Sequence, residues 1–156
     1  MIDKGSQMVL PPPAQIGVVV KNLKEAIDFY SQTFGIGPFQ TIEFAPAKHW
    51  LKGKPTPIRL NIGLCQWGPL QLELIEVVEG DIPHKWFLEE KGEGLQHLGF
   101  IVDNYDKWLS YLRDNRISVL MNAETEVEGM GRVRAAYVES NRTGGVLFEL
   151  IEITPK

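Results

Sequence analysis

The chain has 156 residues, 44% of them apolar, and a formal net charge of −4. This size and composition predict one globular domain with a sizeable core, and the charge offers no basic surface for nucleic acid. We expect no membrane span, because no run approaches the roughly 18 apolar residues that a spanning helix needs. The single cysteine, Cys65, excludes an internal disulfide and is expected in the core. A reducing, cytoplasmic compartment fits this cysteine content and a start without a secretory pattern.

The first half predicts an arm, a helix and four strands. Residues 1–13 end in three prolines, which favours a flexible arm before order begins. Strands are expected over residues 16–20, 39–44, 58–64 and 70–78. After the first of them, Asn22 can cap a helix that ends at Gly35. The proline-rich stretch 45–57 predicts a loop, so His49 within it is expected at the surface.

The second half repeats this order. Its strands are expected over residues 95–102, 117–121, 134–139 and 145–153. Asn104 can cap a helix whose apolar side includes Trp108. The connecting segment 80–94 is expected to be partly helical, with His84 at its surface. The remaining stretch 122–133 predicts a second long loop.

A repeated tetrapeptide relates the two halves. Glu-Leu-Ile-Glu occurs at 73–76 and again at 149–152, each time downstream of a similar apolar strand. We infer two copies of one strand–helix–strand–strand–strand unit. The two units cover about residues 14–79 and 95–154. The predicted fold class is α+β: two tandem βαβββ modules that pack side by side as an incomplete mixed β-barrel around a cleft.

Four polar residues interrupt apolar strands at equivalent places of the two units: Gln15, Glu73, His97 and Glu149. A glutamate is almost never buried without a partner, so two of them at equivalent places call for a cation. One imidazole nitrogen and three side-chain oxygens suit an octahedral divalent Zn, Ni, Co or Mn ion with two positions open. The alternative is a sheet with one solvated face, on which Glu73 and Glu149 are merely exposed. Alternation along each strand places Glu76 and Glu152 on the face away from this site.

The stretches that carry these residues resemble the vicinal oxygen chelate superfamily, which includes glyoxalase I, methylmalonyl-CoA epimerase, extradiol dioxygenases and bleomycin-resistance proteins. The matching stretches are residues 15–30, 72–76, 92–103 and 144–150. The resemblance covers nearly all of residues 14–154. It implies paired βαβββ modules around a divalent metal, with the four polar residues as ligands. It also implies a small-molecule carbonyl or thioester substrate and a homodimer.

Two branches of this superfamily compete. The ligand order Gln, Glu, His, Glu is similar to that of glyoxalase I of the human type, which isomerises the hemithioacetal of methylglyoxal and glutathione. The stretches 92–97 and 144–149 look more like methylmalonyl-CoA epimerase. The chain departs from the epimerase pattern at Gln15 and Gln96, where histidines are usual, and at 52–54, where a base glutamate is usual. An extradiol dioxygenase needs two histidines and one carboxylate, and the ligand strands carry only one histidine.

Both branches remove a proton from the carbon next to a carbonyl. By resemblance, the metal stabilises the resulting enediolate, and Glu149 is the base that moves the proton. Glu73 is then the partner for reprotonation, while Gln15 and His97 are fixed ligands. The leading interpretation is a metal-dependent lyase or isomerase of the glyoxalase type. A non-catalytic drug- or metabolite-binding protein of the same fold is the alternative from another class.

Four further residues are candidates for substrate contact: Trp50, Met130, Arg132 and Arg134. Trp50 lies in a predicted loop that can border the cleft. The other three lie in or follow a glycine-rich turn, where this superfamily often contacts its substrate. An arginine there can meet a carboxylate, a phosphate or a glutathione group, and a solvated charge is the alternative.

Overall fold

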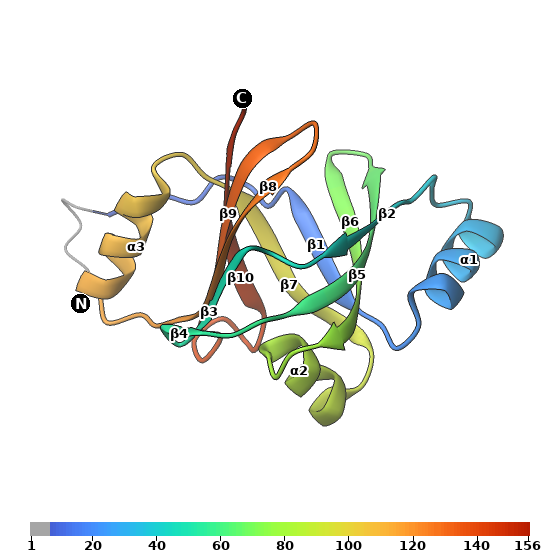
Figure 1. Ribbon diagram of the computed structural model, residues 1–156, viewed down its shortest axis with the longest axis horizontal. Helices are drawn as coiled ribbons and strands as arrows, with labels where there is room; N and C mark the ends of the chain where they lie inside the picture. Colours follow the sequence, from blue (N-terminus) through green and yellow to red (C-terminus); the bar gives the residue numbers. More distant parts are fainter. Residues whose placement is uncertain (1–6) are drawn as a thin grey trace.

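The computed structural model describes residues 7–156, and its centre is one curled sheet of ten strands (Figure 1). The strands are β1 (Gln15–Val19), β2 (Gln40–Phe44), β3 (Lys48–Leu51), β4 (Lys54–Pro55), β5 (Arg59–Trp67), β6 (Leu70–Glu79), β7 (Gly94–Ile101), β8 (Val119–Val127), β9 (Gly131–Val138) and β10 (Leu147–Thr154). The helices are α1 (Leu23–Phe34), α2 (Pro83–Lys91) and α3 (Tyr105–Asp114). The strand order is β2-β5-β6-β1-β7-β10-β9-β8-β3-β4. The sheet curls into a half-barrel, which confirms the predicted α+β class.

Two units with the same order of elements share this sheet. The first contains β1, α1, β2, β5 and β6, and the second contains β7, α3, β8, β9 and β10. In each unit the first strand runs parallel to the last, and the two first strands, β1 and β7, pair antiparallel with each other. Helices α1 and α3 lie at opposite outer sides of the molecule, and α2 lies at the lower end in Figure 1. Helix α2 confirms that the connecting segment is partly helical.

Alternation along the strands divides their side chains between two faces. Leu72 and Leu74 of β6 pack under α1, and Leu150 of β10 packs in the cluster that includes Trp108 of α3. A third cluster forms the apolar interior of the half-barrel and contains Ile75 together with residues of β5, β8 and β9. Ile75 lies two residues after Glu73 on β6, so the two side chains share the inner face. Each outer helix is therefore held by its own module, and the inner face is shared.

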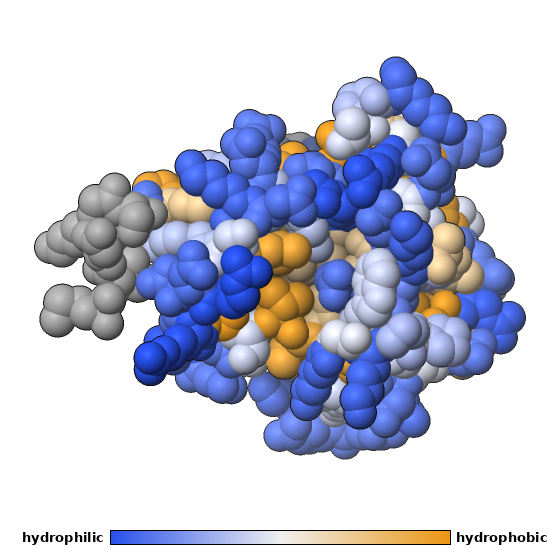
Figure 2. All heavy atoms as spheres, turned by 60° about the vertical axis from the view of Figure 1, so that its left-hand side comes forward, coloured by the Kyte–Doolittle hydropathy of each residue, from blue (hydrophilic) through white to orange (hydrophobic). Residues whose placement is uncertain are grey.

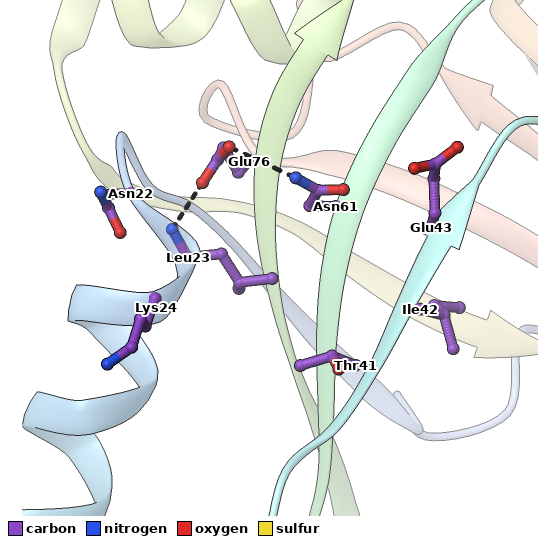
Figure 3. Close-up of a pocket in the computed structure, with 8 residues that line it drawn as sticks. All are labelled: Asn22, Leu23, Lys24, Thr41, Ile42, Glu43, Asn61 and Glu76. Atoms are coloured by element: carbon purple, nitrogen blue, oxygen red, sulfur yellow. Dashed lines mark hydrogen bonds between the residues drawn. The ribbon is translucent and has the colours of Figure 1, made fainter.

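The second glutamate of each repeat caps the helix of its own module. Glu76 Oε2 accepts a hydrogen bond of 2.7 Å from the backbone N–H of Leu23, at the start of α1, where these residues help to line a pocket of about 360 Å³ (Figure 3). Glu152 Oε2 accepts from Tyr105 N–H at 3.0 Å, at the start of α3. Asn22 caps α1 as predicted, by accepting from a backbone N–H at 3.0 Å. Asn104 does not cap α3 with its side chain, because its left-handed backbone (φ 58°) turns it away, which corrects that prediction.

Both predicted long loops are wrong. Within 45–57 the chain forms β3 and β4, and β3 pairs antiparallel with β8 of the other module. The stretch 122–133 is mostly strand, because β8 extends to Val127 and β9 begins at Gly131. Edge pairing between distant segments supplies the hydrogen bonds that make these stretches strands, and local sequence does not show such pairing. The two modules are therefore joined at β1–β7 and again at β8–β3.

The predicted arm lies partly against the domain. Residues 1–6 are outside the described residues, while Met8 and Leu10 pack against the cluster that includes Trp108. Cys65 is buried as predicted. In the described part of the chain no helix has the length and apolarity needed to cross a membrane. On the face shown in Figure 2, apolar side chains gather in the middle of a mostly hydrophilic surface.

Candidate metal centre

Four polar side chains from four neighbouring strands converge on the inner face of the half-barrel. Gln15 is on β1, Glu73 on β6, His97 on β7 and Glu149 on β10. Around His97 Nε2, the oxygen Oε1 of Gln15 lies at 3.3 Å, Oε2 of Glu73 at 3.2 Å and Oε2 of Glu149 at 3.1 Å. His97 is fully buried, and the other three are each less than a tenth exposed. The structure thus brings the four predicted ligands together, and their burial excludes the alternative of a solvated face.

Two glycines make room for the first ligand of the opposite module. Gly17 on β1 stands opposite His97 on β7, and a Cβ on Gly17 would lie 1.9 Å from His97 Cε1. Gly99 on β7 stands opposite Gln15 on β1, and a Cβ there would lie 2.8 Å from both Cβ and Oε1 of Gln15. No real side chain tolerates such approaches without displacement. The shared strand–glycine pattern of the two modules therefore has a packing reason.

A β-bulge turns two successive side chains of β7 inward. Gly17 pairs with His97 whereas Val18 pairs with Leu95, so Gln96 is the extra residue on β7. A bulge of this kind interrupts strand alternation and re-aims a side chain. Gln96 is consequently buried, and its Oε1 accepts a hydrogen bond of 2.9 Å from His97 Nδ1. Because Nδ1 is the donor in this bond, Nε2 is the ring nitrogen left to bind a cation among the three oxygens.

A second glutamine orients the ligand of the first module. The side-chain amide of Gln15 donates from Nε2 to Gln71 Oε1 at 2.8 Å, which leaves Gln15 Oε1 toward His97. Such outer contacts fix the orientation of a ligand and are a regular feature of metal sites. Each module thus supplies one ligand pair and one glutamine that orients its first ligand.

The donor atoms fit a divalent cation. One ring nitrogen can donate only one hydrogen bond, yet three oxygens lie within 3.3 Å of His97 Nε2. Although both carboxylates are that close, Glu73 Oε2 and Glu149 Oε2 have no partner with hydrogen-bonding geometry among the described residues. Glu73, His97 and Glu149 each offer a ligand atom within 4.8 Å of the other two. The two carboxylate charges balance a divalent ion, and burial without one is unfavourable.

The electrostatics of the centre depend on that cation. In its absence, burial lowers the pKa of His97, but the close negative charges of Glu149 and Glu73 outweigh burial and raise this pKa to about 9. Burial raises the pKa of the Glu73 carboxyl. A divalent ion requires neutral histidine and ionised carboxylates, so its binding releases protons. The side chains of Glu73 and Glu149 are 12% and 10% exposed, and their Oε2 atoms are buried.

Comparison with known proteins agrees with this geometry. Residues 14–137 match the sequence profile of the Glyoxalase/Bleomycin resistance protein/Dioxygenase superfamily. The chain belongs to this superfamily. It is 30% identical over 139 residues to the uncharacterized protein YqjC of Bacillus subtilis, a match that covers 88% of this chain and 89% of the relative.

Several solved structures share the fold. A methylmalonyl-CoA epimerase of Streptomyces coelicolor, in complex with 2-nitronate-propionyl-CoA, superposes with a TM-score of 0.69 at 23% identity, covering 94% of this chain and 100% of that one. A hypothetical protein of Bacillus halodurans gives 0.69 at 20% identity, covering 92% and 95%. The epimerase of Mycobacterium tuberculosis gives 0.64 at 21% identity, covering 97% and 96%. At these identities the likeness concerns the fold.

Two of the four candidate substrate contacts, Arg132 and Arg134, lie away from the candidate metal centre. Arg134 stands opposite Glu152 on β10 and donates to its Oε1 at 2.7 Å, on the face that carries α3. Arg134 also donates to Asp106 Oδ1 at 2.8 Å. Arg132, two residues earlier on the same strand face, donates to Glu124 Oε1 at 3.0 Å. Alternation fixes this result, because Glu152 and Glu149 point to opposite faces of β10.

The other two candidates lie outside the buried cluster. Trp50 is on β3, half-buried, and its neighbours His49 and Leu51 point to the opposite face of that strand. Met130 lies in the turn between β8 and β9 and is 38% exposed. The structure places neither of them among the ligands.

Sequence reasoning missed two buried histidines, His84 beside the candidate ligand His97 and His49 on β3. His49 and His84 were expected at the surface, but they are 6% and 0% exposed, which corrects that prediction. The ring centroids of His84 and His97 are 6.0 Å apart, and Tyr137 packs edge-to-face on both rings, at 5.1 Å from His84 and 5.2 Å from His97. Pairing of β3 with β8 turns His49 inward, and α2 carries His84 under the sheet. The only sequence signal was that His49 and Leu51 share one face of a strand, while Trp50 between them takes the other face.

Proposed function

We propose that this protein is a metal-dependent enzyme that moves a proton on the carbon next to a carbonyl or thioester, as a lyase or isomerase of the glyoxalase type. The observation that carries the proposal is the pair of carboxylates at the centre. Glu73 and Glu149 come from equivalent strands on either side of the β1–β7 pair and approach the same His97 nitrogen at 3.2 and 3.1 Å. Two bases on the two flanks of one site can remove a proton and return it.

The residues divide into fixed ligands and proton carriers. His97 and Gln15 are uncharged donors, each held by a glutamine, and they anchor the site. A divalent cation in this position supplies Lewis-acid stabilisation of the negative charge that develops on the substrate oxygens. Glu149 takes the proton from carbon, and Glu73 returns it. Burial keeps bulk water from both carboxylates, which strengthens their interaction with the reacting group.

The donor set favours a borderline metal ion. One imidazole nitrogen with amide and carboxylate oxygens suits Zn²⁺, Ni²⁺ or Co²⁺, and Mn²⁺ is compatible with the oxygen-rich set. Metal content after purification, and reconstitution with each ion in turn, identify the preferred one. Failure of every divalent ion to bind would favour the non-catalytic alternative, a drug- or metabolite-binding protein.

Two substrates separate the two enzymatic branches. The ligand order beginning with Gln15 favours the hemithioacetal of methylglyoxal and glutathione, that is, a lactoylglutathione lyase-like reaction. The superposition on an epimerase that holds 2-nitronate-propionyl-CoA favours methylmalonyl-CoA as the second candidate. Both are assayed side by side on protein loaded with Zn²⁺, Ni²⁺ or Co²⁺. Turnover of one and not the other assigns the branch.

The repeat offers a matched control for the catalytic test. Glu149→Gln is expected to lower turnover by about 10²-fold or more, because it removes the proton carrier. Glu152→Gln, in the same tetrapeptide but on the outer face, is expected to keep turnover on folded protein. Full activity of Glu149→Gln on an identified substrate would overturn the role of Glu149.

We further propose that the protein works as a homodimer in the cytoplasm. The superfamily resemblance supports the dimer, and α1 leaves Phe29 and Phe34 exposed by 59% and 64%. Light scattering coupled to size-exclusion chromatography measures the oligomeric state. A monomer at all accessible concentrations would contradict the dimer.

A further inference from the structure

A groove on the second module is lined by residues other than the four converging side chains. Its volume is about 810 Å³, which is within the range of small-molecule sites. Helix α3, the chain that leaves it and the start of β8 form most of its wall, and the β3–β4 turn and the residue after β9 complete it. Figure 1 shows the chain after α3 running to β8 beside the β3–β4 hairpin. The metal centre therefore does not explain this groove.

The groove combines half-buried apolar side chains with exposed cations. Lys52, Arg113 and Arg116 bring three positive charges, and Glu139 brings one negative charge. Ser118 adds a hydroxyl group. The apolar residues that line the groove are Leu109, Ile117, Val119 and Leu120. The groove thus has an excess of two positive charges, although the chain as a whole has a net charge of −4.

Contacts within the protein leave most of this positive charge unneutralised. In residues 7–156 no carboxylate lies within 4.0 Å of the Lys52 or Arg116 side-chain nitrogens. Arg113 meets only its neighbour Asp114, at 3.7 Å, and both side chains are more than half exposed, at 76% and 72%. Glu139 lies 3.7 Å from Arg142, a cation outside the groove, so part of its negative charge is offset there.

Two of the three cations stand on left-handed backbone. Only three non-glycine residues of the described chain have a positive φ, and two of them line the groove: Lys52 at 48° and Arg116 at 59°. Side chains rarely adopt this conformation, and such exceptions concentrate at functional sites. Backbone hydrogen bonds fix both turns. Lys52 N–H donates to Leu120 C=O at 2.8 Å, and Arg116 N–H donates to Arg113 C=O at 3.0 Å.

The first module shows the usual residue at the corresponding helix end. Helix α1 is followed by Gly35, which is left-handed (φ 66°), as helix ends commonly are. The left-handed residue after α3 is Arg116 instead. In the β3–β4 hairpin, Lys52 and Gly53 form a two-residue turn whose first position usually carries asparagine or glycine. Glycine would fit both positions without strain, so the two cations indicate a use for their charge.

The donors and the charge of the groove select a phosphate group. A phosphate monoester carries about −1.5 to −2 charges at pH 7 and has three terminal acceptor oxygens. These features match the excess of two positive charges and the separate donors of Lys52, Arg113 and Arg116. A carboxylate has half the charge and one oxygen fewer. The apolar side chains call for an apolar part in the same molecule.

We propose that this groove binds the phosphate of a small phosphate ester, whose apolar part lies against Leu109 and Val119. The phosphate belongs either to one end of the substrate or to a separate small molecule. The site stands on its own cavity, charges and backbone, and it does not depend on the proposed function of the metal centre.

A set of three small molecules tests the site. 1-Naphthyl phosphate has both an apolar part and a phosphate, 1-naphthol lacks the phosphate, and inorganic phosphate lacks the apolar part. Their dissociation constants are measured by calorimetry on the full chain in the presence of a chelator, so that no metal ion binds the phosphate. We expect 1-naphthyl phosphate to bind tighter than either of the others by on the order of tenfold or more, and more weakly as the ionic strength rises.

Two glycine variants remove a cation without straining the fold. Arg116→Gly and Lys52→Gly are each expected to weaken the binding of 1-naphthyl phosphate by about tenfold. Both are expected to unfold at the wild-type temperature or above it, because glycine accepts the left-handed backbone. Lys54→Ala is the matched control, since it removes a cation of the same hairpin that does not line the groove. Its affinity should stay within about twofold of the wild type.

The outcomes decide both the site and the source of the phosphate. Equal affinity for 1-naphthyl phosphate and 1-naphthol, wild-type affinity in both glycine variants, or an equal loss in Lys54→Ala overturns the site. Displacement of bound 1-naphthyl phosphate by methylmalonyl-CoA, the phosphate-bearing candidate substrate, assigns the phosphate to the substrate. Binding that methylmalonyl-CoA leaves unchanged assigns it to a separate phosphate ester. Normal turnover by Glu149→Gln overturns the proposed proton carrier alone and leaves this site standing.

Discussion

The two modules build equivalent halves of the candidate metal centre with different donors. On the first strand, the first module provides Gln15 and the second provides His97, and each fits over a glycine of the other module, Gly99 or Gly17. The last strands provide one glutamate each. The backbone arrangement is therefore shared, whereas the donor chemistry differs at one position. The comparison shows that strand pairing fixes where a ligand stands and that the residue type is free to change there.

The outer contacts of the two modules differ more than the ligands. Gln71 orients Gln15 from β6, while the bulged residue Gln96 orients His97 from its own strand. The helix cap of the second module includes an ion pair, because Glu152 also binds Arg134, whereas Glu76 also accepts a hydrogen bond of 3.4 Å from the neutral Asn61. Three variant pairs and one pH comparison break or sharpen this comparison.

The largest effect is expected from the glycines. Gly17→Ala places a methyl group 1.9 Å from the buried His97 ring, so we expect loss of metal binding and a destabilisation of about 3 kcal/mol or more. Gly99→Ala meets Gln15 at 2.8 Å, and its expected cost is about 1–3 kcal/mol with weaker metal loss. Metal stoichiometry and thermal unfolding measure both. Wild-type metal affinity in Gly17→Ala would contradict the packing argument.

The orienting glutamines come next. Gln96→Leu removes the acceptor that fixes the His97 tautomer, and we expect metal affinity to fall by about 10–100-fold. Gln71→Leu removes the acceptor that orients the side-chain amide of Gln15, which is a neutral oxygen ligand. We therefore expect a smaller loss of metal affinity, about threefold to tenfold. Competition with a chelating indicator gives both constants. An equal loss in the two variants would show that tautomer control contributes nothing.

A moderate effect is expected from the two capping glutamates. Glu152→Ala removes a helix cap and a hydrogen-bonded ion pair with Arg134, which corresponds to about 1.5–3 kcal/mol of unfolding free energy. Glu76→Ala removes the cap of α1, for which about 0.5–2 kcal/mol is expected. Urea unfolding measures both values. If Glu76→Ala proved the more destabilising, the ranking of the two caps would be reversed.

The smallest effect concerns pH. Burial raises the pKa of Glu152, but Arg134 and the Tyr105 backbone N–H outweigh it and hold this pKa below its ordinary value of 4.5. A lowered pKa stabilises the fold fully above the ordinary value, and this contribution disappears as pH falls through the lowered one. The stability difference between wild type and Glu152→Gln should therefore shrink on acidification below 4.5. A difference that stays constant throughout that range would refute the linkage.

Much of the site could be predicted because its residues break strong local patterns. Glu73 and Glu149 sit in apolar strands with period-two alternation, and Gln15 and His97 precede a glycine at the same offset. These signals are local and occur twice. The structure brings these four side chains together on the inner face.

The remaining parts depend on contacts between distant segments. His49 turns inward only because β3 pairs with β8, and the sequence of β3 alone resembles a loop. Gln96 turns inward because a bulge interrupts β7, where alternation predicts the other face. His84 is buried by the docking of α2, whose sequence has weak helical periodicity. Arg134 follows alternation, but its partner on the outer face is visible only from the strand register.

The four ligand strands, β6, β1, β7 and β10, are consecutive and interior in the ten-stranded sheet. Every ligand is thus held by a strand with hydrogen-bonded neighbours on both sides. In hydrogen exchange, amides of such strands open last, close to the global unfolding free energy. The four converging donor atoms then keep their spacing while turns and edge strands lengthen, shorten or change residue type. A scaffold organised in this way lets the periphery change in evolution without disturbing the four converging side chains.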